Sequence, residues 1–99
     1  MNPQNTETVE LLSEVFGLSE DQFFNECLKL FLDKKLRAIG MELLTLKMKY
    51  KIESIKDFEI LIQSGKIDKD SSIKEFKYYF LLSKQREFVV KYLEALDNT

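Results

Sequence analysis

The spacing of apolar residues between positions 19 and 50 predicts one long helix. Apolar side chains recur there at intervals of four, three, four, three and four residues, a heptad-like seam of the kind that packs one helix against another. The seam consists of Leu32, Leu36, Ile39, Leu43, Leu46 and Tyr50. Ser19, with Gln22 three residues later, has the pattern of a capping box at the helix start. We therefore expect a long central helix, in which Gly40 either permits a close neighbour or marks a kink or break.

A second set of apolar residues lies on another side of this expected helix. At about 100° per residue, Met41, Leu44 and Met48 fall more than 90° away from the seam. A second surface is needed to cover them, and methionine side chains adapt well to a binding surface. We expect these three residues to face a partner. The alternative is that one chain buries both sets of residues in its own core.

Shorter apolar stripes predict helices on either side of the long one. A first helix, with Asn5 or Thr6 as its cap, is expected to end at Gly17. Ser54, followed three residues later by Asp57, predicts the start of a helix that continues to about residue 64.

A last helix is expected from Ser72, where Glu75 completes another capping pattern, to Leu96. Five consecutive polar residues at positions 83–87 interrupt its apolar stripe. Five residues make more than one full turn and so cover every face of a helix. The helix therefore either projects into solvent at this point or breaks there.

Length and composition favour the same fold class. The chain has 99 residues with three glycines and one proline, Pro3, which leaves little for the turns of a many-stranded sheet. A chain of this size forms one domain with a modest core. We predict an all-α fold, a single small bundle of about four helices over residues 1–99, with flexible tails at 1–5 and 97–99.

Charge is distributed unevenly along the chain. Residues 1–33 carry seven acidic side chains and one basic one, a net charge of −6, whereas residues 34–51 carry six basic and one acidic, a net charge of +5. This order matches the helix dipole, which favours carboxylates at the N-terminal turn and ammonium groups at the C-terminal turn. It would also favour antiparallel pairing of the long helix with a second copy of itself. We therefore expect a homodimer, with a merely solvated charged face as the alternative.

Residues that carry chemistry are scarce. The chain has no histidine and one cysteine, Cys27, which we expect to be a small buried core residue. Without these ligands a zinc site is excluded, and no phosphate-binding loop or nucleophile elbow motif occurs. Glu53 and Asp57 form a capped helix start rather than a catalytic pair. We expect no enzymatic activity, no cofactor, no metal and no small-molecule substrate.

Nucleic-acid binding is the alternative function. The C-terminal part of the long helix carries Lys47, Lys49 and Lys51, which could contact phosphates, and residues 54–65 with the following helix loosely match a helix-turn-helix. Against this stand the net charge of −2 and a pI near 5.2. A small DNA-binding transcriptional regulator is therefore kept as the second hypothesis.

The second half of the chain carries a family resemblance. Along residues 42–96, a leucine-rich helix runs into Lys49-Tyr50, Phe58-Glu59 follows the cap at Ser54, Gly65-Lys66-Ile67 follows Ile62, and the last helix ends in Tyr92-Leu93-Glu94. This segment resembles short helical proteins of archaea and bacteria that are presumed components of toxin–antitoxin pairs. The resemblance implies a protein partner, such as a nuclease-like toxin. Those proteins usually have a glycine where this chain has Lys51.

The remaining sequence patterns concern the location of the protein in the cell. The chain has no stretch of about eighteen uncharged apolar residues, and residues 1–4 have neither a basic start nor an apolar signal core. We expect a cytoplasmic protein that does not enter membranes. The second apolar set on the long helix and the missing chemistry together predict a protein-protein interaction module that self-associates or sequesters a protein partner through apolar helix faces. The family resemblance implies that this partner is held in the manner of an antitoxin.

Overall fold

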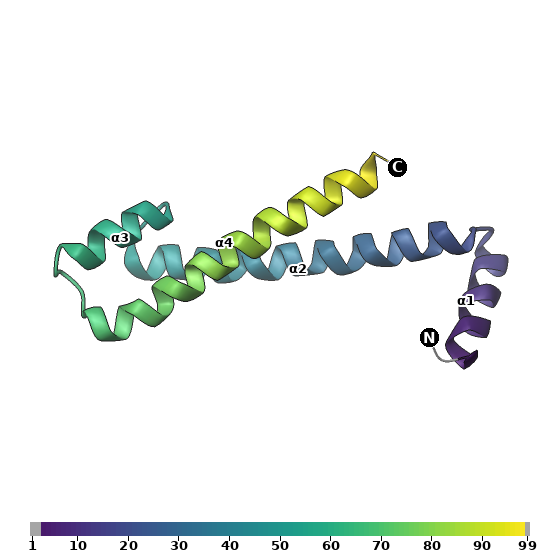
Figure 1. Ribbon diagram of the computed structural model, residues 1–99, viewed down its shortest axis with the longest axis horizontal. Helices are drawn as coiled ribbons and strands as arrows, with labels where there is room; N and C mark the ends of the chain where they lie inside the picture. The colour runs from purple at the N-terminus through teal and green to yellow at the C-terminus, as the bar shows by residue number, and fades with distance from the viewer. Residues whose placement is uncertain (1–2, 99) are drawn as a thin grey trace.

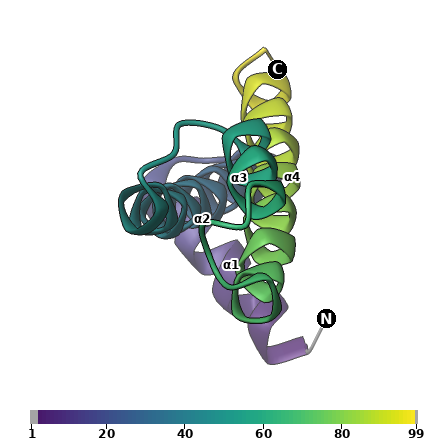
Figure 2. The ribbon, with the colours of Figure 1, turned by 90° about the vertical axis from the view of Figure 1, so that its left-hand side faces the viewer.

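The computed structural model describes residues 3–98, which form four helices and no strand. In chain order these are α1 (Pro3–Phe16), α2 (Glu20–Tyr50), α3 (Ile55–Gln63) and α4 (Lys69–Asp97). The two long helices, α2 and α4, run in opposite directions and cross; α3 lies at one end of the pair and α1 projects from the other (Figure 1). Figure 2 shows α3 and α4 side by side at the end opposite α1. The all-α prediction is confirmed.

Helix α2 has the predicted start and is continuous. The Ser19 hydroxyl accepts the Gln22 N–H at 3.1 Å, and the Gln22 side chain accepts the Ser19 N–H at 2.9 Å, which completes the capping box. The helix passes through Gly40 without a break and ends at Tyr50. Lys51 then adopts the left-handed conformation (φ 54°), and the Ile52 N–H donates to the carbonyl of Lys47. The α2 helix is therefore a single rod of about 46 Å.

Gly40 offers a direct test of packing around α2. A Cβ atom built on Gly40 would have no neighbour within 4 Å, so this glycine permits no close approach within the chain. Because glycine costs a helix interior about 1 kcal/mol relative to alanine, we expect Gly40→Ala to raise the free energy of unfolding by about that amount. Urea unfolding followed by circular dichroism measures it. A loss of stability in the variant would show that Gly40 is crowded in the protein in solution.

The caps of α3 and α4 agree with the prediction at one helix and not at the other. The Ser54 hydroxyl accepts the Asp57 N–H at 3.2 Å, as expected. The expected start of the last helix at Ser72 is wrong, because α4 begins at Lys69 with Asp68 as its N-cap. Asp68 is itself a strong capping residue, and the earlier start leaves Ser72 buried, with its hydroxyl donating to the Asp68 carbonyl at 2.5 Å.

Along the rest of its length α4 is unbroken. The polar residues 83–87 form one turn that is exposed except for the half-buried Ser83 and does not interrupt the helix. At the other end of the chain, α1 begins at Pro3, and the expected cap at Asn5 or Thr6 is wrong. Proline suits the first helical turn, since it needs no hydrogen-bond acceptor there. Gly17, with φ 68°, ends α1 as predicted. Of the expected tails, residues 1, 2 and 99 lie outside the described residues.

The core lies where α3 packs on the crossing of α2 and α4. Phe58 of α3 is 0% exposed, and its ring meets those of Tyr50, Phe76 and Tyr79 at centroid distances of 4.5, 5.5 and 6.0 Å. Beyond this aromatic cluster the core continues along the crossing through Ile39, Leu43, Leu46, Leu82 and Val89. The heptad-like seam of α2 is thus confirmed as its core-facing side, with Leu32, Leu36 and Tyr50 partly buried at its ends.

The chain is elongated rather than compact. Its dimensions are 60 × 28 × 17 Å and its radius of gyration is 19.6 Å, whereas a compact domain of this length has a radius of gyration of about 13 Å. The accessible surface is 7848 Å², compared with about 5,900 Å² for a typical folded monomer of this mass. A large part of the apolar surface is consequently left without cover.

Candidate interaction surfaces

Met41, Leu44 and Met48 form an exposed apolar stripe on α2, which we call the outer stripe. Their exposed fractions are 65%, 50% and 70%, respectively. They lie on the side of α2 that faces away from the buried seam. The alternative in which a single chain buries both sets of apolar residues is therefore wrong for this fold.

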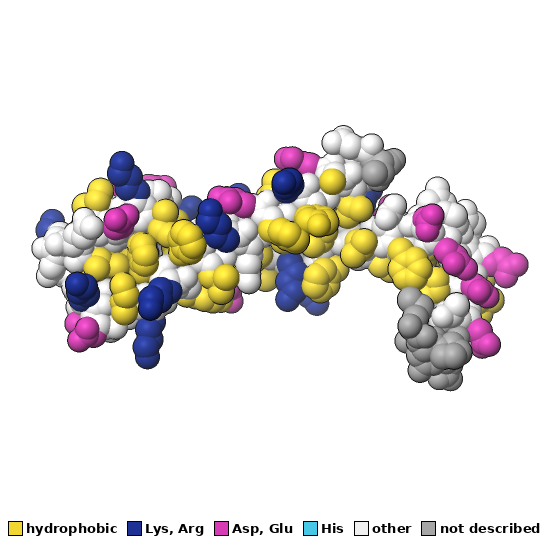
Figure 3. Space-filling model, in the orientation of Figure 1, with side chains coloured by type: hydrophobic (Ala, Val, Ile, Leu, Met, Phe, Trp, Pro, Cys, Tyr) yellow, Lys and Arg dark blue, Asp and Glu magenta, His cyan; other side chains and the backbone are white. Residues whose placement is uncertain are grey.

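A larger exposed apolar surface lies between α2 and α4. The two helices diverge toward the α1 end and leave a hollow of about 680 Å³ between them, lined mainly by apolar atoms. Phe31 of α2 and Phe88 of α4 stand at its edges and are 56% and 58% exposed. Figure 3 shows hydrophobic side chains gathered on this side of the molecule, where the helices separate. Such a hollow can receive side chains from another helix.

Further large side chains extend this surface along both helices. Phe24 and Leu28 precede Phe31 on α2, and the rings of Phe88 and Tyr92 stack on α4 with centroids 4.5 Å apart. We call the whole surface the groove face; it comprises Phe24, Leu28, Phe31, Tyr78, Phe88 and Tyr92. Its residues were not singled out from the sequence. Their spacing of three and four residues was a visible signal, although it is the same signal that marks a buried seam.

Two charged side chains border the groove face. The Lys35 ammonium lies 5.6 Å from the centre of the Phe31 ring, within the range of a cation–π contact. Glu42 accepts a hydrogen bond from the Tyr78 hydroxyl. This bond, together with partial desolvation, raises the pKa of Tyr78 above its usual value. Tyr78 therefore stays neutral at physiological pH and remains a hydrogen-bond donor at the edge of the surface.

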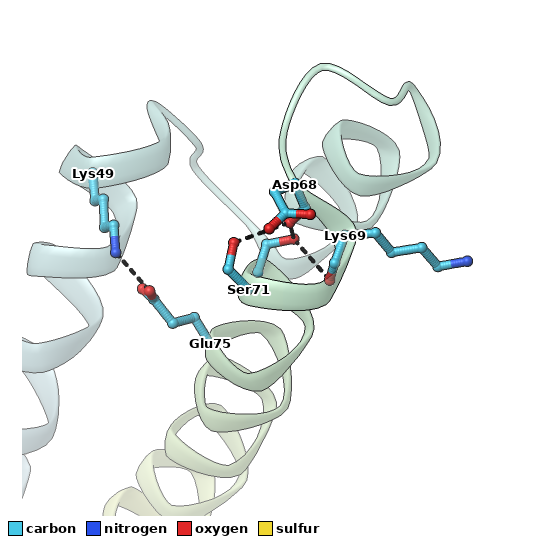
Figure 4. A network of polar contacts seen from close by, with 6 residues as sticks. Lys49, Asp68, Lys69, Ser71 and Glu75 are labelled. Carbon is cyan, nitrogen blue, oxygen red and sulfur yellow. Dashed lines mark hydrogen bonds and ion pairs between the residues drawn. The ribbon is translucent and has the colours of Figure 1, made fainter.

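The three lysines proposed as nucleic-acid contacts do not share one face. Lys47 and Lys49 are two residues apart on α2 and so point in directions about 200° apart. The Lys49 ammonium pairs with the Glu75 carboxylate of α4 at 2.5 Å (Figure 4), a hydrogen bond that raises the pKa of Lys49. Lys51 lies beyond the helix end. Contact of these residues with nucleic acid stays a prediction, without a continuous basic surface to support it.

Cys27 is exposed, so its expected place in the core is wrong. The reason is the direction of this side chain: at about 100° per residue, Cys27 points about 140° away from Leu32 of the seam that packs against α4. The last turn of α4 does reach this end of α2, where the Lys29 ammonium lies 3.4 Å from the Asp97 carboxylate. An apolar neighbourhood in the sequence therefore did not lead to burial.

The described residues contain no group of three or more acidic or cysteine side chains placed to hold a metal ion. Over the same part of the chain, none of the helices combines the length and the apolar character that a membrane crossing requires. Apart from the Ser72 hydrogen bond within α4, the ion pairs and side-chain hydrogen bonds described above either join α2 to α4 or cap a helix.

The fold and these surfaces define an elongated all-α protein built on two long crossed helices, with apolar helix faces open to solvent. The chain belongs to the Uncharacterized protein MJ0235 family, whose family model matches residues 1–99. No curated protein and no solved structure matches it. The family description names no toxin and no antitoxin, so the resemblance to toxin–antitoxin proteins stays a prediction.

Proposed function

We propose that this protein is a non-catalytic interaction module of the cytoplasm that self-associates by packing the exposed apolar helix faces of two copies together. The observation that supports the proposal most is the excess of solvent-accessible surface area over that of a compact monomer of the same mass. The chain exposes about 2,000 Å² more than a compact monomer of 11.7 kDa would. A standard stable interface removes about 800 Å² from each partner. The uncovered surface is thus more than sufficient for one dimer interface.

The distribution of charge along α2 supports the view that the partner is a second copy of the same chain. The first turn of α2 carries Glu20 and Asp21, and its last turn carries Lys47 and Lys49. When two such helices approach in antiparallel orientation, the acidic end of each is attracted toward the basic end of the other. This arrangement favours the encounter of two copies and disfavours a parallel register, in which like charges would meet.

The test is the molar mass of the full chain in solution, measured by light scattering after size exclusion and by sedimentation equilibrium. We expect a mass of twice 11.7 kDa, with dissociation only on dilution. Nuclease treatment before the measurement removes any contribution from nucleic acid. A mass of 11.7 kDa over the whole accessible concentration range would contradict self-association and leave a different protein as the partner.

The outer stripe is proposed as the contact for a different protein, in the manner of an antitoxin-like sequestering module. Methionine side chains repack readily against varied surfaces. In affinity capture from the native lysate, a stoichiometric companion of the wild-type chain should be lost with the Met41→Glu, Met48→Glu variant. A companion retained by this variant would show that the outer stripe is not the contact.

A further inference from the structure

We infer that the second copy docks on the groove face and not on the outer stripe. This inference rests on the proposed self-association and assigns the surface that carries it. The occupant is the same face of the other copy, so that the α2 and α4 helices of both copies form one four-helix arrangement around a shared core. A twofold interface of this kind requires a patch that is complementary to itself.

The spacing of residues on the groove face is that of a helix-packing surface. On α2, Phe24, Leu28 and Phe31 are followed by Lys35, Ala38 and Glu42 at intervals of four and three residues. On α4, Tyr78, Leu81, Gln85, Phe88 and Tyr92 follow the same alternation. Each stripe suits a facing helix, because side chains with this spacing interlock with those of a neighbour. The middle parts of both stripes border one hollow, so side chains of a facing copy can enter between the two helices.

The extent of the two surfaces decides between them. On α2 alone the two apolar surfaces are of equal length, eight residues or about 10 Å each, from Met41 to Met48 on the outer stripe and from Phe24 to Phe31 on the groove face. The groove face also includes α4 and four large aromatic side chains beyond Phe31, namely Phe24, Tyr78, Phe88 and Tyr92. The stabilisation from removing apolar surface from water grows with its area, so the groove face is the stronger contact.

The charges on the groove face point to a copy in antiparallel orientation. Lys35 and Glu42 lie on the same stripe, seven residues apart, with Ala38 between them. Antiparallel pairing centred near Ala38 brings Lys35 of each copy toward Glu42 of the other. The small side chain of Ala38 permits the helices to approach closely at the centre. The order of charges on this stripe is thus complementary to itself in the antiparallel orientation, as a twofold interface requires.

The first experiment compares two matched double variants of the full chain by sedimentation equilibrium. Phe31→Glu with Phe88→Glu places two carboxylates on the groove face, at positions outside the buried core. Loss of two central aromatic contacts should raise the dissociation constant of the dimer about a hundredfold or more. Met41→Glu with Met48→Glu places the same charges on the outer stripe and should leave the dimer mass unchanged. Circular dichroism checks that both variants remain helical.

A charge exchange keeps the inference testable if the phenylalanine variant fails to fold. Lys35→Glu and Glu42→Lys should each weaken the dimer, and the double variant should recover most of the wild-type dissociation constant. A dimer that survives Phe31→Glu with Phe88→Glu overturns the inference, and so does a dimer lost in the outer-stripe variant. In both cases self-association itself still stands. A wild-type chain that is monomeric instead refutes the proposed function, and this inference fails with it.

Discussion

Replacing Phe58 with alanine should lower the free energy of unfolding by about 3–5 kcal/mol, which is a large share of the stability of a chain this size. Phe58 is the most deeply buried large side chain, and it joins α3 to both long helices through Tyr50, Phe76 and Tyr79. Its removal leaves a cavity that three rigid rings cannot close. The truncation therefore loses both the transfer free energy of the ring and the packing of its neighbours.

Urea unfolding of Phe58→Ala, followed by circular dichroism, measures this loss. The matched control is Phe80→Ala, which removes the same side chain from a half-exposed position on α4 that contacts Lys84. The control should change the free energy of unfolding by less than about 1 kcal/mol. Equal losses in the two variants would show that the aromatic cluster around Phe58 is not the centre of the core.

Replacing Leu82 with alanine should destabilise the protein by about 2–5 kcal/mol. Leu82 is buried at the crossing of α2 and α4, in the same cluster as Ile39, Leu43 and Val89. The two long helices contact each other mainly through this cluster, so a cavity there loosens the crossing itself. The expected change is a lower urea midpoint, without a change in the helical content of the folded state.

Leu30→Ala is the control for Leu82→Ala. Leu30 is an exposed leucine of α2 that belongs to neither the core nor the groove face. Its truncation removes the same atoms from an uncovered position and should cost little. A loss at Leu30 as large as that at Leu82 would contradict the crossing described above, since it would require Leu30 to be packed in the folded chain.

The sequence predicted α2 well because three independent signals agree there. The capping box at Ser19, the regular seam through Leu43 and the dipole-matched charges all describe one helix, and the structure confirms its unbroken course. The start of α4 was predicted wrongly because Asp68 and Ser72 are both good capping residues four positions apart. Local preference does not choose between two adequate caps; the packing of the extra turn, with Ser72 buried, does.

The interaction surfaces were only partly predictable. The outer stripe follows from the helical period, since Met41 and Met48 must point away from the seam whatever α2 packs against. The exposure of Cys27 follows from the same period, since this residue points about 140° away from Leu32 of the seam. The groove face depends instead on where α4 crosses α2. Phe31 has the spacing and hydrophobicity of a core residue. No local pattern shows that the chain supplies no helix to cover it.

The continuity of α2 has a mechanical consequence. A helix with its backbone hydrogen bonds intact resists bending. The α2 helix, about 46 Å long, therefore acts as a rigid spacer between α1 and the aromatic core around Phe58. The bend between α1 and α2 lies at Gly17, outside the spacer. The start of α2, where α1 is attached, is consequently held at a fixed distance from the aromatic core at the opposite end of the molecule.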